Sequence, residues 1–280
     1  MSSTQPILSF CITCLNRFHQ LSQTLPYNLK KNTTYEPRLE FVLVNFIDQT
    51  QNDVNGHRVH KWISERYQRA IRRGYLRYAV TNQLPTWHAS VAKNTSHHLA
   101  QGKFLINLDG DNYVNFLEVQ ELLKRDKILQ KCLYHGFSNQ WHDGTYGRIG
   151  MSRQAFTKIG GYDESFLPMG GQDMDLLIRL QHQFPNYRLL KNKHPIKALH
   201  NTKKESLQYI NSNLTVENSE ESSHQRWKQM EKKNRQSLNQ KIRRKNYCQS
   251  LQTGVPVHLV TNFNISLEEM LATLTSEKIP

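Results

Sequence analysis

The sequence has no apolar run near the roughly 20 residues needed to cross a bilayer, and it begins without a basic and apolar leader. We therefore expect a protein that is made and kept in the cytosol. Its four cysteines are too few and too scattered for a disulfide framework. Cys11 and Cys14 have the spacing of a redox or zinc pair, but they lie in an apolar stretch without a second pair, which favours buried thiols.

Two phosphate-binding patterns are also missing, the GxGxxG turn and the P-loop. Their absence argues against a dinucleotide-dependent dehydrogenase and a P-loop NTPase. Acidic residues are the minority, with 23 Asp and Glu against 37 Lys and Arg, which leaves a net charge of +14. Such a balance indicates an anionic partner: nucleic acid, a membrane surface or a phosphorylated ligand.

Much of the positive charge lies in one late segment, 226–245. It contains Glu231 and nine basic residues: Arg226, Lys228, Lys232, Lys233, Arg235, Lys241, Arg243, Arg244 and Lys245. A solvated helix and a contact for a polyanion or membrane are both compatible with this run. Because 203–246 is polar, we expect a domain over 1–202 and a basic, partly helical extension over 203–280, ending in a strand at 255–261 and a helix at 267–274.

The first half alternates between strand and helix patterns. Strand-like runs at 7–14, 39–45, 76–80 and 103–109 are separated by helical stretches at 21–29, 58–73 and 88–99. Further on, we expect a helix at 116–133, a strand at 147–152 and a helix at 153–159. Pro26 predicts a kink or early stop in the first helix. The alternation predicts an α/β fold whose mostly parallel sheet has helices on both faces and a ligand site at the carboxyl ends of its strands.

A pair of carboxylates stands at the end of the fourth strand. Asp109 and Asp111 are separated by Gly110, so both can turn toward one ligand. Hard oxygen ligands of this kind suit Mg²⁺ or Mn²⁺ with a substrate phosphate, although the same residues are also good turn formers. The neighbouring strand ends would add the residues that a nucleotide meets: Asn16, Arg17, Asn45 and Asp48.

A second acidic cluster follows two glycines at 170–171. Asp173 and Asp175 lead directly into an apolar helical stretch. Carboxylates are favoured at a helix N-terminus whatever else they do, so a capped helix start and a functional site both remain open.

Taken in order, these segments resemble the family 2 glycosyltransferases with the GT-A fold, over about 7–200. The resemblance rests on the pieces 11–17, 43–48, 92–112 and 147–176 and on His200, the block 147–176 being most like the galactosyltransferase-type branch. It implies metal-dependent, inverting transfer of a sugar from a nucleotide-sugar, such as a UDP-sugar, to a hydroxyl of a glycan, a lipid-linked or another acceptor. Two residues depart from the family pattern: Gln172 stands where Glu is usual, and Asn45 where Asp is usual.

The resemblance also implies roles for individual residues. Asp109 and Asp111 with His200 would hold Mn²⁺ or Mg²⁺, and Lys93 would lie on the donor side with Gly110. Asp173 would act as general base, because an alcohol is a poor nucleophile at neutral pH. Asp175 would orient the loop or bind the acceptor. Without the resemblance, a histidine near a strand end is more often structural.

Two rival functions remain. One is a catalytically silent GT-A domain that binds an anionic partner through 226–245, with a membrane surface expected more than nucleic acid. The other is a nucleotidyltransferase, which also uses paired carboxylates and a metal but has no need for the downstream acidic block. Asp109, Asp111, Asp173 and His200 occurring together favour the active glycosyltransferase.

Overall fold

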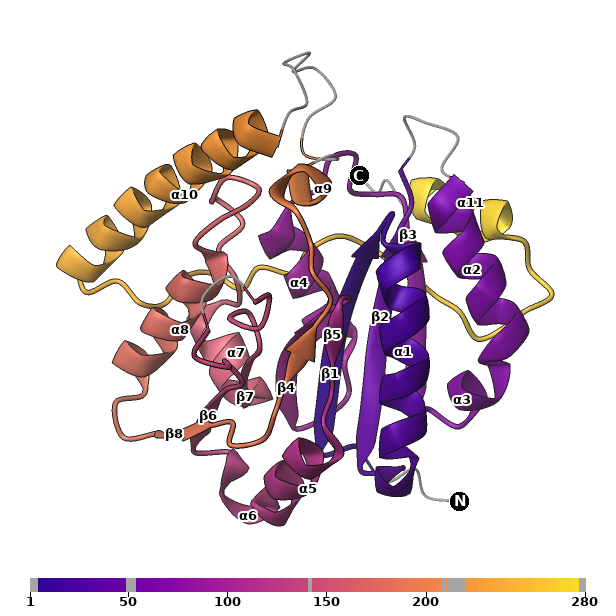
Figure 1. The fold of residues 1–280 in the computed structure, drawn as a ribbon, viewed down its shortest axis with the longest axis horizontal. Coiled ribbons are helices and arrows are strands. Elements are labelled where there is room, and N and C mark those ends of the chain that lie inside the picture. Colours follow the sequence, from indigo (N-terminus) through magenta and orange to yellow (C-terminus); the bar gives the residue numbers. More distant parts are fainter. Residues whose placement is uncertain (1–4, 49–53, 141–142, 208–209, 211–219, 277–280) are drawn as a thin grey trace.

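The computed structural model describes residues 5–48, 54–140, 143–207, 210 and 220–276. Its core is a central sheet with helices on both sides (Figure 1). In spatial order the strands are β10 (His258–Leu259), β3 (Leu76–Thr81), β2 (Leu39–Phe46), β1 (Leu8–Leu15), β4 (Phe104–Asp109), β7 (Ile149–Ser152), β6 (Cys132–His135) and β8 (Arg188–Lys191). A small second sheet pairs β5 (Asn112–Tyr113) with β9 (Lys197–Ala198).

Strands β1 to β4 run parallel to one another, and β8 runs parallel to β6. Antiparallel pairing joins β7 to both β4 and β6, and β10 to β3. The predicted mostly parallel sheet flanked by helices is confirmed. In the β1–β4 register Thr13 lies opposite Asp109, so the loop after β1 and the turn after β4 meet at one edge of the sheet.

The helices begin and end as follows: α1 (Phe18–Asn32), α2 (Val54–Arg66), α3 (Gln68–Arg72), α4 (Ala89–Leu99), α5 (Phe116–Lys124), α6 (Asp126–Leu129), α7 (Arg153–Ile159), α8 (Gln172–Gln183), α9 (Lys203–Leu207), α10 (Glu220–Arg243) and α11 (Leu267–Ser276), with a 3-10 turn η1 (Thr33–Tyr35). Among the described residues, none of these helices combines the length and the apolar character needed to cross a membrane.

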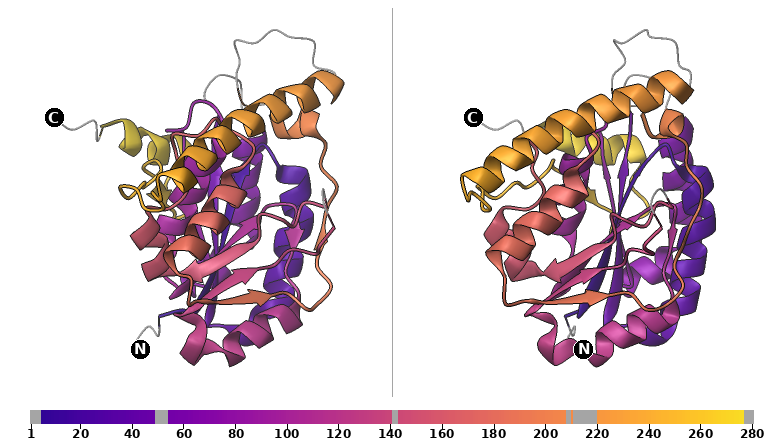
Figure 2. Two further views of the ribbon diagram at one scale, coloured as in Figure 1. Left: turned by 90° about the vertical axis from the view of Figure 1, so that its left-hand side faces the viewer. Right: turned by 60° about the vertical axis from the view of Figure 1, so that its left-hand side comes forward.

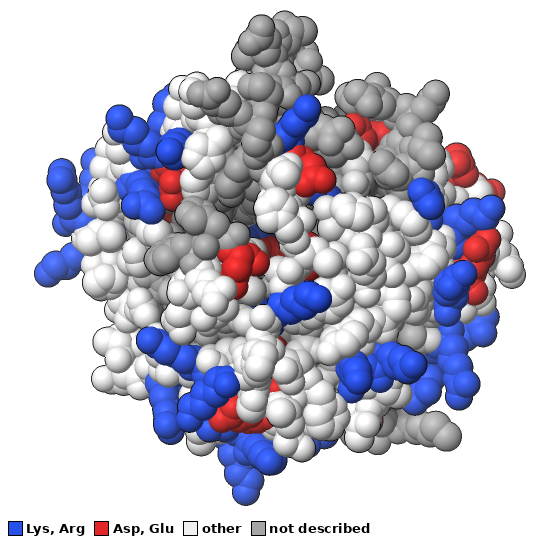
Figure 3. Space-filling model, viewed as in Figure 1, with Lys and Arg blue, Asp and Glu red and all other residues white. Residues whose placement is uncertain are grey.

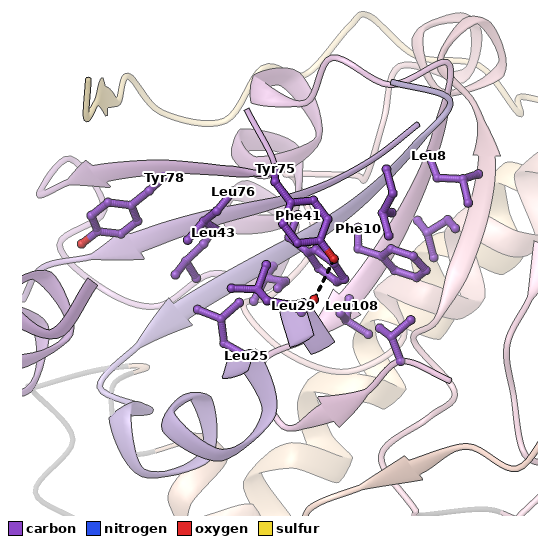
Figure 4. Packing of buried hydrophobic residues seen from close by; sticks show 14 of the residues in the cluster. Leu8, Phe10, Leu25, Leu29, Phe41, Leu43, Tyr75, Leu76, Tyr78 and Leu108 are labelled. Carbon is purple, nitrogen blue, oxygen red and sulfur yellow. Dashed lines mark hydrogen bonds between the residues drawn. The ribbon is translucent and has the colours of Figure 1, made fainter. Parts of the chain in front are cut away.

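Alternate residues of the central strands pack on opposite faces of the sheet, as the two-residue period of a strand requires. Phe10 and Ile12 join a core with α1, α2, α5, α6 and α11 (Figure 4). Cys11 and Val42 face the other way, toward α7 and α8, and Val44 packs near α4. Both faces of these strands are therefore buried, which explains their near-continuous apolar sequences.

Aromatic residues occupy much of the first core. The rings of Phe10 and Phe41 stack with centroids 5.5 Å apart, and Tyr75 meets Phe41 edge to face. Tyr75 can be buried because its hydroxyl donates a hydrogen bond to the Leu29 carbonyl at 2.9 Å (Figure 4). This bond ties the residue before β3 to α1 within the same core.

Helix α1 continues through Pro26, where the sequence predicted a kink or stop. A proline inside a helix costs about 3 kcal/mol. Against this, Leu21, Leu25 and Leu29 are all buried in the core, and each such burial contributes about 1.5–3 kcal/mol. Packing therefore outweighs the lost hydrogen bond, and the helix reaches Asn32.

The C-terminal residues lie against the same sheet. β10 extends the sheet beyond β3, and Leu267 and Met270 of α11 are buried in the first core. Helix α10 crosses the side of the molecule that carries α8 (Figure 2). Cys11 and Cys14 are buried free thiols, as predicted.

Candidate active site

Helix α1 fixes the turn that follows β4. The Thr24 hydroxyl donates a hydrogen bond to the Gly110 carbonyl at 2.6 Å. One helical turn later, Asn28 Nδ2 donates to the Asn112 carbonyl at 3.0 Å, and Asn28 Oδ1 accepts from the Val114 N–H at 2.7 Å. Both side chains are buried, so these bonds hold the backbone of the turn in place.

The turn carries Asp109 and Asp111 at its two ends. Asp109 Oδ1 accepts a hydrogen bond from Asn107 Nδ2 at 3.2 Å, and Asp111 Oδ1 accepts from Asn112 Nδ2 at 2.7 Å. Burial, and then the negative charge of Asp109, raise the pKa of Asp111 to about 6, while Asn112 and Arg17 act in the opposite direction. Two neighbouring carboxylates at one turn fit a divalent cation, which would relieve the repulsion between them.

His200, the predicted third metal ligand, lies close to this turn in the chain fold, but its side chain is not grouped with the two carboxylates. The Leu199 N–H donates to the Asp111 carbonyl at 2.8 Å, and His200 is the next residue. Its side chain is exposed. Within the described part of the chain, no three His, Cys, Asp or Glu side chains are grouped to hold a metal ion. The structure therefore brings Asp109 and Asp111 together without His200, and the fit to Mg²⁺ or Mn²⁺ rests on the two carboxylates.

The loop after β1 brings Asn16 and Arg17 to the same edge. Asn16 adopts a left-handed φ of 54°, and its Oδ1 is buried without a hydrogen-bond partner among the described residues. Arg17 Nη1 donates to Asn201 Oδ1 at 2.7 Å, and its charge lowers the pKa of Asp111. A cationic side chain and an unused acceptor thus stand next to the acidic turn, where a nucleoside diphosphate could contact both.

The two residues at the end of β2 are placed differently from each other. Asn45 is fully buried, and its Nδ2 donates to the Gly56 carbonyl at 3.0 Å and to the Tyr78 hydroxyl at 3.3 Å. These bonds attach α2 to the sheet, so the predicted contact of Asn45 with a nucleobase does not fit its position. Asp48 lies just beyond the strand and is partly exposed.

Lys93 of α4 joins the two acidic clusters. Its Nζ lies 2.6 Å from Asp173 Oδ1 and 3.7 Å from Asp109 Oδ1, and only 8% of its side chain is exposed. Burial would lower the pKa of Lys93, but the carboxylates of Asp173 and Asp109 raise it above its ordinary value. Lys93 therefore places a positive charge between the turn that carries Asp109 and Asp111 and the start of α8.

Gly147 lies where the same two carboxylates converge. A Cβ at this position would stand 3.0 Å from Oδ2 of both Asp109 and Asp173. That spacing is tighter than ordinary contacts, so a side chain at Gly147 would push the carboxylates apart. Glycine here lets β4 and α8 present their acidic groups to one small volume.

The two predicted catalytic residues of α8 differ in exposure. Asp173 lies in the first helical turn, and a quarter of its side chain is exposed. Asp175 is fully buried, and its Oδ2 accepts from Arg179 Nε at 2.7 Å while Arg179 also donates to the Gly161 carbonyl. Asp175 therefore cannot contact an acceptor. The other predicted role, orienting the loop, is the one that its position supports.

A buried network that no sequence pattern predicted lies behind the acidic turn. Arg148, 1% exposed, donates to Glu118 Oε2 at 3.1 Å, to Asn112 Oδ1 at 2.9 Å and to the Tyr113 carbonyl at 2.8 Å. The Tyr134 hydroxyl also donates to Glu118. The available signal was an arginine inside an apolar strand pattern, where a charge needs a partner.

Aromatic side chains lie on the Asp173 side of the site. His135, Phe137 and Tyr146 form a cluster with ring centroids 5.0–5.5 Å apart, and all three are partly exposed. Burial, and next the charge of Asp173, raise the pKa of Tyr146. The cluster therefore adjoins the carboxylate that was predicted to be the base.

Sequence comparison matches one segment of the chain to a known family. Residues 132–203, which span β6 to the start of α9, match the family described as the N-terminal domain of galactosyltransferase. The matched segment contains Gly147, Asp173, Asp175 and His200. No curated protein sequence matches the chain.

Several solved structures are similar to that of this chain. TarS 1-349 from S. aureus in complex with UDP is 13% identical, with a TM-score of 0.52 over 80% of this chain and 70% of that chain. The same fragment in complex with UDP-GlcNAc is 10% identical, with a TM-score of 0.50 over 91% and 97%. The mannosyltransferase PcManGT from Pyrobaculum calidifontis, in complex with GDP-Man and Mn²⁺, is 13% identical, with a TM-score of 0.48 over 68% and 55%, so this chain spans about half of its length.

Proposed function

We propose that this chain, which is GT-A glycosyltransferase-like in its fold and in its matched segment, transfers a sugar from a nucleotide-sugar donor to an acceptor hydroxyl with inversion. The observation that carries the proposal is the convergence of Asp109 and Asp173 on the buried Lys93 at the carboxyl edge of the sheet. A UDP-sugar is the donor class that we favour, because TarS, whose fold this chain shares, has been solved with UDP and with UDP-GlcNAc.

The donor would lie along the edge formed by the turn after β4 and the loop after β1. Asp109 and Asp111 would hold Mg²⁺ or Mn²⁺, which supplies positive charge to the leaving diphosphate. Arg17 stands on the same side and can donate to phosphate oxygens. Asp48, just beyond β2 and partly exposed, would contact the nucleoside at that strand end.

Asp173 would remove the proton from the acceptor hydroxyl. As that proton moves to the carboxylate, the acceptor oxygen forms a bond to the anomeric carbon, and the bond from that carbon to the diphosphate breaks. Both electrons of the broken bond leave with the nucleoside diphosphate, so the sugar configuration inverts in a single displacement. General-base assistance of this kind contributes about 10²–10⁴ in rate.

Lys93 would link the donor and acceptor sides. Its ammonium group donates a hydrogen bond to Asp173 Oδ1 at 2.6 Å and would hold that carboxylate in position for the acceptor. A diphosphate bound at Asp109 would offer the ammonium group a second anion, and its charge would then stabilise the leaving group. The acceptor sugar would pack on the aromatic cluster of His135, Phe137 and Tyr146, beside Asp173.

A nucleotide-sugar panel tests this proposal. The melting temperature and the release of nucleoside diphosphate are measured with each donor, in Mn²⁺, in Mg²⁺ and with a chelator. A donor present at 100 times its Kd stabilises the fold by about 2.7 kcal/mol. We expect metal-dependent stabilisation that Asp111→Asn removes. The control Asp126→Asn, at a side chain that is 40% exposed on α6, should leave it intact. Stabilisation that is indifferent to the metal and to Asp111→Asn contradicts the donor assignment.

The exposed basic residues of α10 favour a second candidate function, a silent domain that binds an anionic partner. This candidate predicts partner binding without donor turnover. Release of nucleoside diphosphate by the wild type, lost in Asp173→Asn, decides for the enzyme.

A further inference from the structure

Helix α10 has an inner face that is anchored to the acceptor side of the site. Asn234 is buried, accepts from the Leu167 N–H at 2.8 Å and donates to the Gly170 carbonyl at 2.7 Å. Lys241 pairs with Asp163 and lies 3.7 Å from Asp175. The helix therefore holds the loop that ends three residues before Asp173, and its position relative to the proposed base is fixed.

The outer face of α10 has a different composition. We define it as the exposed residues Gln225, Lys228, Gln229, Lys232, Lys233, Arg235, Gln236, Asn239, Gln240 and Arg243. None of these exposed side chains is acidic or apolar. Lys and Arg side chains follow the upper left edge of the molecule, over α10 (Figure 3). The outer face thus presents cations and amides only.

Four of these cations have no charge partner in the part of the chain that the structure describes. Arg235 pairs with Glu231 at 3.1 Å. Within the described residues, Lys228, Lys232, Lys233 and Arg243 form no ion pair. At 1.5 Å rise per residue, Lys228 and Arg243 lie about 22 Å apart along the helix, so the four charges form a linear stripe. A stripe of uncompensated charge suits an extended polyanion.

The composition of the outer face distinguishes between polyanions. A helix that lies in a membrane interface buries an apolar face with Trp, Phe or Leu, and the outer face has no exposed residue of that type. Single-stranded nucleic acid is bound through exposed aromatic side chains, which are also missing from this face. Glutamine and asparagine amides can both donate to and accept from sugar hydroxyls. The combination therefore fits a glycan that carries negative charges.

We propose that the outer face of α10 binds a linear anionic glycan, one bearing phosphate, sulfate or carboxylate groups, and that this glycan is the acceptor. The body of the polymer lies along α10, and its terminal hydroxyl reaches Asp173. The binding surface follows from the charges and amides of α10, whereas its role as an acceptor site rests on the proposed function.

Two charge-matched variants of the full chain test the proposal. The first carries Lys228→Gln, Lys232→Gln, Lys233→Gln and Arg243→Gln. The control carries Lys30→Gln, Lys103→Gln, Lys127→Gln and Lys131→Gln, all at exposed positions outside α10. Binding to dextran sulfate is measured against salt, with neutral dextran, duplex DNA and phosphatidylserine-containing vesicles as comparisons. Donor hydrolysis and the melting temperature are measured separately for each variant.

We expect the α10 variant to bind dextran sulfate at least about tenfold more weakly at 0.15 M salt, with a log–log salt slope reduced by about 3. The control should change less than threefold, and both should keep wild-type melting temperature and donor hydrolysis. Equal losses in the two variants, or none, overturn the proposal. Tighter α10-dependent binding of DNA or vesicles than of dextran sulfate overturns the choice of partner. If the wild-type protein does not hydrolyse any donor, that result counts against the proposed function and not against the binding surface on α10.

Discussion

Replacing Lys93 with methionine removes the ammonium group that joins Asp109 and Asp173. Breaking a fully buried ion pair by removing one partner costs about 3–5 kcal/mol. Here Lys93 is nearly buried, but Asp173 is 25% exposed and Asp109 37%, so water screens the carboxylates left behind. We therefore expect Lys93→Met to destabilise the fold by about 2 kcal/mol, less than the buried limit.

A double-mutant cycle separates this ion pair from general loss of packing. The melting temperature should fall by about 4–8 °C in Lys93→Met. Adding Asp173→Asn removes the orphaned charge, so the double variant should be more stable than the sum of the single effects by about 1 kcal/mol or more. Lys103→Met, at an exposed position, is the control and should change stability by less than about 0.5 kcal/mol.

The same variant should lose donor chemistry. Without Lys93, a positive charge is missing where the diphosphate leaves, and loss of one such group costs about 10²–10³ in kcat. Additive stability effects of Lys93→Met and Asp173→Asn would refute the pairing. A melting temperature equal to that of the Lys103→Met control would refute it as well.

Two further predictions concern the site. The pKa of Asp111 is raised to about 6, so its carboxylate becomes neutral, and a poorer cation ligand, as the pH falls through 6. Mn²⁺-dependent donor binding, measured by calorimetry, should therefore weaken as the pH falls from 7 to about 5. In Asp111→Asn the binding should be weak at every pH. Binding that stays constant from pH 7 to about 5 would contradict this. Gly147→Ala should lower kcat about tenfold or more with a smaller change in KM, because its Cβ would stand 3.0 Å from both carboxylates. Unchanged steady-state kinetics would show that the two groups need not converge.

The strands that carry the site could be predicted because they are buried on both faces. β1, β2 and β4 are near-continuous apolar runs, and the residues at their ends could be placed at one edge of the sheet from the alternation with helices. The role of α1 was missed. Gln20, Thr24, Asn28 and Asn32 recur every four residues and are all buried, but a polar stripe ordinarily marks a solvent-facing side.

Other features depend on tertiary contacts that sequence patterns do not report. The first two residues of β6, Cys132 and Leu133, were included in a predicted helix at 116–133, because a short apolar run suits either structure. The burial of Asp175 depends on its pairing with Arg179, which also donates to the Ile159 carbonyl at the end of α7, and no local pattern contains these contacts. In the same way, the basic run 226–245 looked uniform, whereas the structure turns Lys241 inward and Lys232 outward.

The central claim is that Asp173 is the general base, and the transfer rate of Asp173→Asn with a matched donor and acceptor tests it most directly. Asparagine keeps the size of the side chain but cannot take the proton. Our account predicts a loss of about 10²–10⁴ in the transfer rate, with metal-dependent donor binding retained because Asp109 and Asp111 are untouched. Transfer at a rate near that of the wild type would contradict it.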